Sequence, residues 1–432
     1  MKKNKEKITL FWFRRDLRIS DNKALHEALK SPHPVLPIFI FDEEITSSLP
    51  EDDGRITFIY DTLYALNEIL ITHSSCIYCL KGKPTDIWKQ LIGEFDIDAV
   101  FANEDYEPYG TKRDAEVEVL LNQKNIKLSL FKDQVIFAKN EVVKKDLTPY
   151  TIYTPFKNKW LELFTTVKLT DYVVNEWDKY AKIKFAFPKL QQLNFKRSSV
   201  QTHTYNINEL DNYDETRNFP ALNATSKLGP HLRFGTVSIR EIISKTKANK
   251  IFLSELIWRE FFMQILYHFP HVIDNNFKKK YDLIQWRNNR EEFEKWKNGE
   301  TGYPIVDAGM RELNATGYMH NRVRMVTAGF LCKHLLIDWK WGEAYFAEKL
   351  LDYELSANNG NWQWSAGTGC DSAPYFRVFN PTEQVKKFDK QLTYINKWVP
   401  ELSDLTYPAP MVDHKFARER AISTYKSGLN SL

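Results

Sequence analysis

The chain has 432 residues, of which 43% are hydrophobic and 27% charged, and its 60 basic and 56 acidic side chains give a formal charge of +4. This length allows two or three domains, while so small a charge permits a local basic face without demonstrating nucleic-acid binding. Four cysteines in a chain of this length exclude a disulfide framework, whereas twelve tryptophans are an unusually high number.

Strand and helix patterns alternate over residues 1–131. Short apolar runs typical of strands occur in "ITLFWF", "VLPIFIF", "SSCIYCLKG", "DAVFAN" and "IKLSLF". Between them lie segments with helical spacing, such as "NKALHEALK", "TDIWKQLIGEF" and "KRDAEVEVLLNQKN". Strict alternation predicts an α/β domain with a doubly wound parallel sheet, covered by helices on both faces. No G-x-G-x-x-G or G-x-x-x-x-G-K-[ST] motif opens these helices, so the usual glycine-built phosphate loops are absent.

The start of the chain carries no recognisable targeting signal. The apolar run of residues 8–13 ends at an arginine, too early for the core of a signal peptide. No stretch approaches the length of a membrane helix, so we expect a cytoplasmic protein without a membrane partner. Cys76 and Cys79 have the spacing of some metal sites, but residues three apart on a strand point to opposite faces. Because no second pair follows, we interpret them as strand cysteines and expect no metal.

The rest of the chain divides into a connector and a helical domain. Residues 132–211 have a weak pattern with scattered Lys, Thr, Tyr and Pro, which we interpret as a long connector. Residues 212–432 contain segments with apolar residues at i, i+3 and i+4, including "SELIWREFFMQILYHF", "PIVDAGMRELNATG" and "NRVRMVTAGFLCKHLL". This spacing predicts an all-α domain.

Three polar groupings in the helical half indicate a cavity. On a helix, Glu255, Trp258 and Arg259 would share one face, although a surface ion pair beside a half-buried tryptophan explains them equally well. A second face would mix an amide, a guanidinium and a thioether, which suits a pocket better than a core. Its members are Asn321, Arg324 and Met325. Thr225 and Ser226 precede a helix, where they would bind phosphate or simply cap the helix. As a set, these groups suggest a cavity for a phosphorylated ligand.

Long motifs in the same order make the chain resemble the photolyase/cryptochrome family, and most closely the class I cyclobutane pyrimidine dimer photolyases. They are "FWFRRDLRISDNKAL", "TPFKNKW", "YDETRNFPALNATSKLGPHLRFGTVS", "SELIWREFF", "GETGYPIVDAGMRELNATGYMHNRVRM", "LDYELSANNGNWQW" and "APYFRVFNPTEQ". The resemblance implies an antenna-type α/β domain joined by a long connector to a helical FAD-binding domain.

The function implied by this resemblance is light-dependent DNA repair. In the family, light-excited reduced FAD gives an electron to a pyrimidine dimer that has been flipped out of the duplex. We therefore expect a monomeric carbon–carbon lyase whose partner is UV-damaged DNA. Two alternatives remain open, a six-four photolyase and a blue-light receptor of the cryptochrome type. The six-four branch has histidines where this chain has Asn321 and Met325, and cryptochromes commonly replace the residue at Asn358.

The resemblance also assigns residues to the cofactor. By similarity, FAD would be contacted by Tyr213, Thr225, Ser226, Lys227, Leu228, Gly229, Arg259, Arg324, Asp352, Glu354 and Asn358. Arg324 and Asp352 would form an ion pair beside the flavin, and Asn358 would face its central nitrogen. Gly229 stands where the family often has Ser, and Glu354 where it usually has Asp.

A second set of residues is assigned to the damaged DNA. It consists of Glu255, Trp258, Asn321, Arg322, Met325, Trp364, Arg377 and Gln384, and with Asn358 the residues Glu255 and Asn321 are the expected catalytic groups. Trp258 and Trp364 would form walls for the flipped bases, and the arginines would hold flanking phosphates. An electron route to the flavin would run through Trp362, Trp339 and Trp286. Trp296 and Trp341 have no such match, and we assign them to the core.

The nature of a second, antenna chromophore follows from the segment "DYEPYGTKRD". Folate-binding members carry an Asn-Glu pair in this region, whereas this chain has Tyr109 and Gly110. We therefore expect a deazaflavin or a flavin, or an empty cleft, rather than folate.

Overall fold

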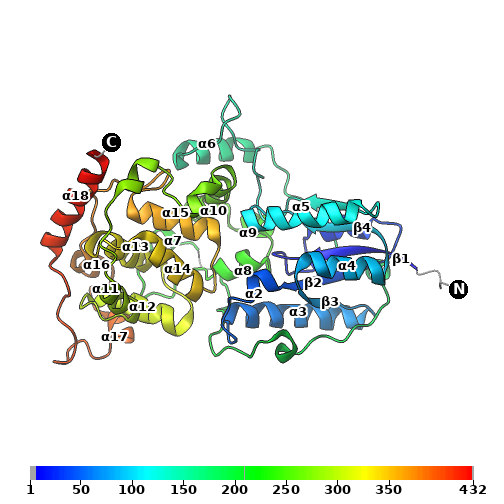
Figure 1. The fold of residues 1–432 in the computed structure, drawn as a ribbon, viewed down its shortest axis with the longest axis horizontal. Helices are drawn as coiled ribbons and strands as arrows, with labels where there is room; N and C mark the ends of the chain where they lie inside the picture. Colours follow the sequence, from blue (N-terminus) through cyan, green and yellow to red (C-terminus); the bar gives the residue numbers. More distant parts are fainter. Residues whose placement is uncertain (1–5, 209, 431–432) are drawn as a thin grey trace. The chain divides into compact units, whose positions relative to one another are not determined.

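The structure is a computed structural model that describes residues 6–208 and 210–430, and the chain forms two compact units (Figure 1). The sheet unit comprises residues up to 141 together with 162–205 and 228–248. The helical unit comprises residues 142–161, 206–227 and those from 249 onward. Each unit is therefore assembled from separated stretches of sequence. The predicted limits 131 and 211 of the connector remain a prediction.

The sheet unit contains five parallel strands in the order β3-β2-β1-β4-β5. These are β1 (Lys7–Phe13), β2 (Val35–Asp42), β3 (Tyr78–Gly82), β4 (Asp96–Asn103) and β5 (Lys127–Phe131). Central β1 pairs with β2 and β4, so that Phe11 lies opposite Pro37 on one side and Phe101 on the other. The predicted parallel sheet is confirmed.

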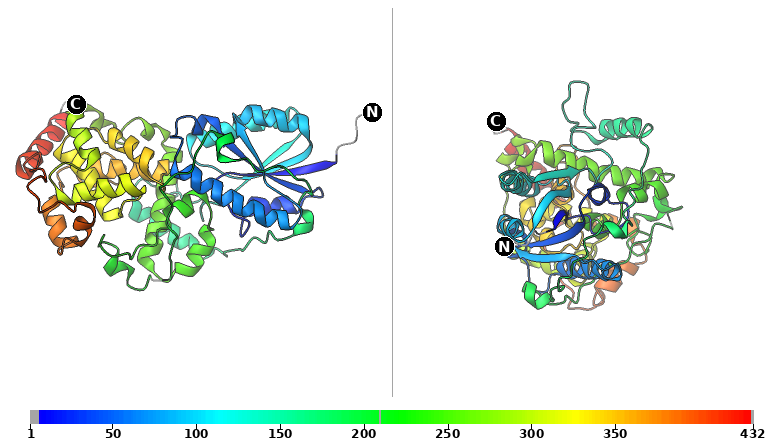
Figure 2. Two further views of the ribbon diagram at one scale, coloured as in Figure 1. Left: turned by 90° about the horizontal axis from the view of Figure 1, so that it is seen from below. Right: turned by 90° about the vertical axis from the view of Figure 1, so that its right-hand side faces the viewer.

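Helices cover both faces of this sheet (Figure 2). The helices of the sheet unit include α1 (Lys23–Leu29), α2 (Glu43–Thr46), α3 (Gly54–Thr72), α4 (Pro84–Glu94), α5 (Pro108–Asn122), α8 (Gly229–Phe234) and α9 (Ile239–Thr246), of which α1, α3, α4 and α5 cover the faces. Alternate residues of β1 enter two different cores. Phe11 and Phe13 pack with α1 and α3, whereas Leu10 and Trp12 pack with α4 and α5. This division explains why β1 is apolar at nearly every position, as expected for a strand buried on both faces.

A network of buried ion pairs connects α9 with the segment that follows β1. Arg240 pairs with Asp21 at 3.0 Å and with Asp133 at 2.8 Å, and Arg18 pairs with Asp133 at 2.5 Å. Ser238, the N-cap of α9, donates a further hydrogen bond to Asp21. These contacts explain why residues 228–248 belong to the sheet unit although they follow a stretch of the helical unit.

The cysteine pair differs in detail from its prediction. Strand β3 begins at Tyr78, so Cys79 lies on the strand but Cys76 precedes it. The Cys76 thiol donates to the carbonyl of Ile183 and accepts from the amide of Phe185, and burial raises its pKa. All four cysteines are free thiols. Within the described residues, no group of three or more His, Cys, Asp or Glu side chains is arranged to hold a metal ion.

The helical unit is built around α10 (Lys250–His268), α12 (Pro304–Thr316), α13 (Asn321–Gly329), α14 (Trp339–Lys349) and α15 (Leu355–Ala366). Around them lie α7 (Tyr213–Thr216), α11 (Arg290–Asn298), α16 (Pro381–Phe388), α17 (Thr393–Trp398) and α18 (His414–Asn430), and α6 (Tyr153–Phe164) begins in this unit. The segment expected as one helix from residue 321 instead changes to a π-helical turn at Phe330–His334. The predicted helical domain is confirmed.

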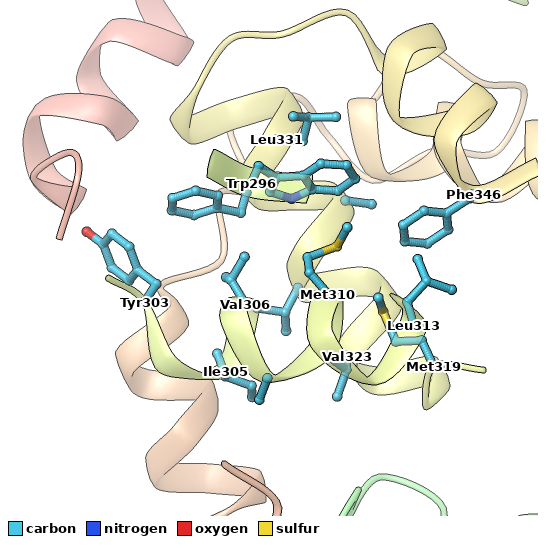
Figure 3. Packing of buried hydrophobic residues seen from close by; sticks show 14 of the residues in the cluster. Trp296, Tyr303, Ile305, Val306, Met310, Leu313, Met319, Val323, Leu331 and Phe346 are labelled. Carbon is cyan, nitrogen blue, oxygen red and sulfur yellow. The ribbon is translucent and has the colours of Figure 1, made fainter. Parts of the chain in front are cut away.

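The main core of this unit surrounds α12. Figure 3 shows Trp296 lying across Val306 and Met310, with Leu331 and Phe346 beside it. Trp296 is fully buried, and its indole N–H donates to the carbonyl of Thr327. Trp341 is only partly buried and packs against the same cluster. Both tryptophans thus occupy core positions, as expected.

Helix α15 was not predicted from the pattern, because its sequence "LSANNGNWQWSA" lacks an apolar stripe. Its small residues allow close packing. A Cβ atom at Gly360 would lie 2.1 Å from the Phe262 ring of α10, and one at Gly342 of α14 would lie 2.1 Å from the Trp362 ring of α15. The helix ends at Gly367, whose φ of +87° suits only glycine well. Glycine therefore lets α15 approach both neighbours.

Among the helices described, none combines the length and the apolar character needed to cross a lipid bilayer.

Candidate active site

Most of the predicted site residues lie on α7, α10, α13, α15 and the loops around them, while Trp339 lies on α14 and Gln384 on α16. Helix α15 packs against α10, α13 and α14, which brings these elements together in the helical unit. Leu228 and Gly229 belong instead to the sheet unit, at the start of α8.

The loop of residues 225–227 has an unusual backbone conformation and does not cap the helix that follows it. The N-cap of α8 is Leu228, with no side-chain cap hydrogen bond, so the capping interpretation of Thr225 and Ser226 is wrong. Lys227 adopts a φ of +54°, an unusual value for a residue with a side chain. Its ammonium lies 3.6 Å from the centre of the Tyr318 ring, and burial lowers the pKa of Lys227. The Thr225 hydroxyl is 3.2 Å from the Tyr318 hydroxyl.

Two ion pairs of the helical unit involve residues predicted to contact a cofactor. Arg324 binds Asp352 at 2.9 Å and donates to the carbonyl of Met319. Burial would lower the pKa of Arg324, but the Asp352 carboxylate raises it, so the guanidinium stays charged. Asp352 Oδ1 is buried without a hydrogen-bond partner. Arg259 lies 3.5 Å from Glu354, so the glutamate at this position provides a carboxylate close to the arginine.

Asn358 is held in one orientation by Glu343 of α14. Its amide nitrogen donates to the Glu343 carbonyl at 3.1 Å and to the Glu343 carboxylate at 2.8 Å. An amide nitrogen has two hydrogens, so both are used, and the carbonyl oxygen of Asn358 remains as an acceptor. Burial raises the pKa of Glu343. The residue therefore offers an acceptor to any N–H group placed before it.

Glu255 and Trp258 both have partners that the sequence did not indicate. Arg217 of the α7 C-terminus donates to Glu255 at 2.7 Å. The Trp258 ring is stacked on Tyr153, with ring centres 3.6 Å apart and planes 8° from parallel. The Tyr153 hydroxyl lies 2.6 Å from both the carbonyl and the hydroxyl of Ser254. Tyr153 thus covers one face of Trp258, and the Phe262 ring also stacks against it with ring centres 5.4 Å apart. A ligand can therefore meet only the part of the partly exposed ring that these two residues leave uncovered.

Helix α13 displays its polar residues from a firmly capped N-terminus. The His320 Nδ1 atom accepts from the amide of Arg322 at 3.1 Å, so this nitrogen carries no proton. Asn321 is exposed, and no hydrogen bond to another described residue involves its side chain. Arg322 donates to Asn218 at 2.6 Å and lies over the Phe388 ring at 4.5 Å. Burial and the nearby Arg217 and Arg377 lower the pKa of Arg322.

The other residues predicted to contact DNA differ in how far they are exposed to solvent. Met325 and Trp364 are half-buried, and Arg377 is exposed on the loop after α15. Gln384 lies on α16, where its side-chain oxygen is buried without a partner. Tyr213 is buried against Phe252 of α10. These positions are compatible with contact to a ligand, but none of them defines one alone.

Helix geometry separates the two tryptophans of "NWQW". Residues two apart on a helix differ in direction by about 200°, so Trp362 and Trp364 point to nearly opposite sides of α15. Trp362 is 2% exposed, and its ring lies 6.2 Å from Trp296 in an edge-to-face contact. Trp339 is also buried, whereas Trp286 is partly exposed. The three predicted members of an electron route therefore include two buried rings and one that reaches the surface.

At the carboxyl ends of the strands, Tyr109 donates to Asp42, and a Cβ atom at Gly110 would lie 2.5 Å from the carboxyl carbon of Asp105. Asp105 lies within ion-pair distance of Arg15 and Arg113. This edge of the sheet is thus rich in charges that pair with one another.

Several residues of the site escaped the sequence interpretation. Arg217, Asn218, Tyr153, Glu343 and Tyr318 contact predicted site residues, yet they come from four different elements or loops. Only Arg217 offered a local signal, since it follows Tyr213 by one helical turn. The others contact the site through tertiary packing.

Comparison with known proteins agrees with this arrangement. The family model described as "FAD binding domain of DNA photolyase" matches residues 252–406, and the one described as "DNA photolyase" matches residues 9–173. A deoxyribodipyrimidine photo-lyase from Synechococcus sp. is 34% identical over 96% of both chains. The chain therefore belongs to the DNA photolyase family.

Solved structures show the same architecture. A bacterial class III photolyase from Agrobacterium tumefaciens has a TM-score of 0.88 at 32% identity, with 99% of this chain and 98% of the other covered. An archaeal photolyase from Sulfolobus tokodaii, described with two FAD molecules and a novel light-harvesting cofactor, has a TM-score of 0.86 at 34% identity and covers 97% and 99%.

Proposed function

We propose that the protein is a deoxyribodipyrimidine photo-lyase, a light-dependent DNA-repair enzyme that splits cyclobutane pyrimidine dimers into two pyrimidines. The observation that carries this function is the joining of two residue sets by α15. On this helix, Asn358 belongs to the residues assigned to FAD and Trp362 to the electron route that leads to it. Trp364, on the other side of the helix, belongs to the residues assigned to damaged DNA, here called the lesion set. Full-length relatives that bear this enzyme name support the same conclusion.

The donors and acceptors of the helical unit fit FAD. Lys227, Arg259 and Arg324 provide positive charge for a diphosphate and an electron-rich ring. The oriented Asn358 carbonyl suits the N–H of a reduced flavin, and Asp352 Oδ1 is a buried acceptor that has no protein partner. We assign Tyr213, Thr225, Ser226, Leu228, Gly229 and Glu354 to the same cofactor. When bound and excited by blue light, reduced FAD supplies the electron that opens the cyclobutane ring.

The lesion side of the site would hold a flipped pyrimidine pair. Trp258, backed by Tyr153, and Trp364 provide apolar walls, with Met325 packed beside them. Glu255 keeps one carboxylate oxygen on Arg217 and offers the other to the pyrimidine edge. Asn321 presents an amide at the start of α13 for the same edge. Flipping costs a few kcal/mol, and less for a lesion that already stacks and pairs poorly.

Phosphates next to the lesion would be held by Arg322, Arg377 and Gln384. Such contacts fix the position of the DNA without reading its sequence. Trp286, Trp339 and Trp362 form the proposed route for an electron from outside to the cofactor site. We assign the protein to the cytoplasm, which agrees with its four free thiols. We also propose a monomeric state.

A second chromophore in the sheet unit remains part of this proposal. Tyr109 and Gly110 differ from the Asn-Glu pair of folate-binding members, so a flavin or deazaflavin is favoured over folate if the site is used. The Sulfolobus structure is described with a second FAD as a light-harvesting cofactor.

Two neighbouring functions are less favoured. In a six-four photolyase, histidines would replace Asn321 and Met325, and the one histidine here, His320, uses Nδ1 to cap α13. A cryptochrome-type receptor commonly lacks the asparagine at position 358, whereas this chain keeps it and orients it through Glu343.

The test is direct repair of a defined lesion. The purified, reduced protein is mixed with an oligonucleotide that contains one thymine cyclobutane dimer, and blue light is applied. We expect the absorbance of intact thymine to return. A normal flavin spectrum without any return of absorbance would exclude the repair function and favour the receptor.

A further inference from the structure

The connector carries a narrow β-hairpin of residues 143–149 that no part of the proposed site uses. Val143 and Pro149 form an antiparallel bridge, and Lys144 donates its amide to the Thr148 carbonyl at 2.9 Å. The Leu147 amide donates to the Lys144 carbonyl at 3.0 Å, which closes a four-residue turn. In Figures 1 and 2 the hairpin is the narrow loop that stands out beside α6.

The tip of this hairpin is costly for the folded protein. Leu147 is 79% exposed and has a φ of +63°. Glycine or asparagine would adopt this left-handed backbone with less strain, and a polar side chain would be better hydrated. A strained and exposed apolar residue suggests a role outside folding.

The hairpin is also positively charged. Lys144 and Lys145 are exposed, and neither lies within ion-pair distance of a carboxylate among the described residues. Residues 142–161 contain four lysines and one aspartate. Leu147 follows the two lysines and Asp146, and a single leucine offers too little apolar area for a protein interface, which normally needs about 1,000 Å² or more. Phosphates beside a base or sugar match this combination better.

The chain that follows the hairpin contacts Trp258, one of the residues assigned to damaged DNA. Four residues after Pro149, Tyr153 stacks on Trp258, and its amide donates to Asp371 at 2.9 Å. Asp371 lies in the loop that also carries Arg377. The strand that leaves the hairpin therefore ends in contact with one wall of the proposed lesion site.

We propose that the hairpin of residues 143–149 is a DNA-contacting finger, in which Lys144 and Lys145 bind phosphates and Leu147 packs against the sugars or bases near the flipped dimer. This inference rests on the proposed function. The lysines add affinity for any DNA, and the leucine adds affinity for the distorted DNA around a lesion.

The first test measures binding in the dark. The Lys144→Ala/Lys145→Ala double variant is titrated with labelled dimer-containing and undamaged oligonucleotides over a range of salt concentrations. We expect the slope of log affinity against log salt to become shallower by about 2, and equally for both DNAs. The Lys124→Ala/Lys127→Ala variant in the sheet unit is the matched control and should keep the wild-type slope. An unchanged slope for the hairpin variant would overturn the role of the lysines.

The second test separates the leucine from folding. Leu147→Gly relieves the backbone strain, so its resistance to urea should stay equal or rise. Its affinity for dimer-containing DNA should nevertheless fall by about tenfold, because one apolar contact is lost. Leu405, whose side chain is even more exposed than that of Leu147, gives the control Leu405→Gly. Wild-type affinity in Leu147→Gly would refute the leucine contact, whereas failure of wild-type protein to split the dimer in light would refute the repair function instead.

Discussion

Two charged regions of the molecule differ in how many of their carboxylate oxygens accept hydrogen bonds from the protein. In the sheet unit, all four carboxylate oxygens of Asp21 and Asp133 accept hydrogen bonds from Arg18, Arg240 and neighbouring groups. In the helical unit, Asp352 Oδ1 accepts none, and Glu255 uses one oxygen only. The first arrangement is complete without a ligand, whereas the second leaves acceptors for one.

This difference separates structural charges from functional ones. A buried ion pair that satisfies all its atoms tolerates burial, but removal of one partner leaves an uncompensated charge. A partly satisfied site costs stability unless a ligand completes it. The comparison therefore predicts opposite consequences for stability and for activity when each region is changed.

The largest effect should follow from Asp133→Ala. This change leaves Arg18 and Arg240 buried without their common carboxylate, which should lower the free energy of unfolding of the sheet unit by about 3–5 kcal/mol. Urea denaturation followed by circular dichroism measures the loss. The exposed pair of Asp61 and Arg197 gives the control, since Asp61→Ala should cost less than about 1 kcal/mol. Equal losses in the two variants would remove the distinction.

Glu255→Gln should behave in the opposite way. The free energy of unfolding should change little, because the group is partly exposed and the amide still accepts from Arg217. Repair should fall by about ten- to a hundredfold, equivalent to about 1.5–3 kcal/mol for a hydrogen bond to a charged group. Single-turnover repair of a thymine-dimer oligonucleotide measures this, with bound flavin checked by absorbance. Glu291→Gln on α11, at an exposed ion pair, should leave repair unchanged.

Tyr153→Leu tests whether Tyr153 affects DNA binding through Trp258, the ring on which it stacks. Loss of the ring stack should weaken binding of dimer-containing DNA by about two- to twelvefold, which corresponds to about 0.5–1.5 kcal/mol. The loss should shrink when Trp258 is already replaced by Ala, because contacting residues are not additive. Phe293→Leu, which removes a similar stack on Trp296, should leave DNA binding intact. Fully additive losses would show that Tyr153 acts independently of Trp258.

The smallest expected effect is on the pH dependence of stability, to which Asp133 and Glu343 should contribute with opposite signs. Burial raises the pKa of Asp133, but Arg18 and Arg240 lower it overall, so its stabilisation is present above the unfolded value of about 3.9 and is lost as the pH falls. Burial raises the pKa of Glu343, so its contribution is fully present below about 4.3 and is lost as the pH rises through the folded value. Glu343→Gln should therefore gain stability relative to wild type as the pH rises above about 4.3. Parallel urea-denaturation results across this range would contradict the assignment.

The sequence alone predicted the architecture where local patterns dominate. Strand β1 reads as an apolar run because both of its faces are buried. Helix α10 shows helical spacing in its first half, where Phe252, Leu253, Leu256 and Ile257 are buried, whereas residues 260–266 are buried on all sides. Helix α15 was missed, since it relies on Gly360 and small residues for close packing rather than on an apolar stripe. The π-helical turn after α13 was missed as well, because its five residues are too few to show a change of period in the sequence.

The candidate site divides in a similar way. Shared helix faces suggested Glu255 with Trp258 and Asn321 with Arg324, and the family resemblance supplied their roles. The partners Glu343 and Tyr153 could not be found, because each reaches its target from another helix. Distances of this kind depend on how helices pack, and one sequence does not encode them in a readable pattern.

The discontinuity of the sheet unit limits how this protein can be divided by genetic engineering. A fragment that stopped at residue 141 would contain Asp21 and Asp133 but not Arg240, which lies about a hundred residues further along the chain. Exchange of the sheet unit with that of a relative therefore requires transplanting separated gene segments together, with residues 228–248 among them.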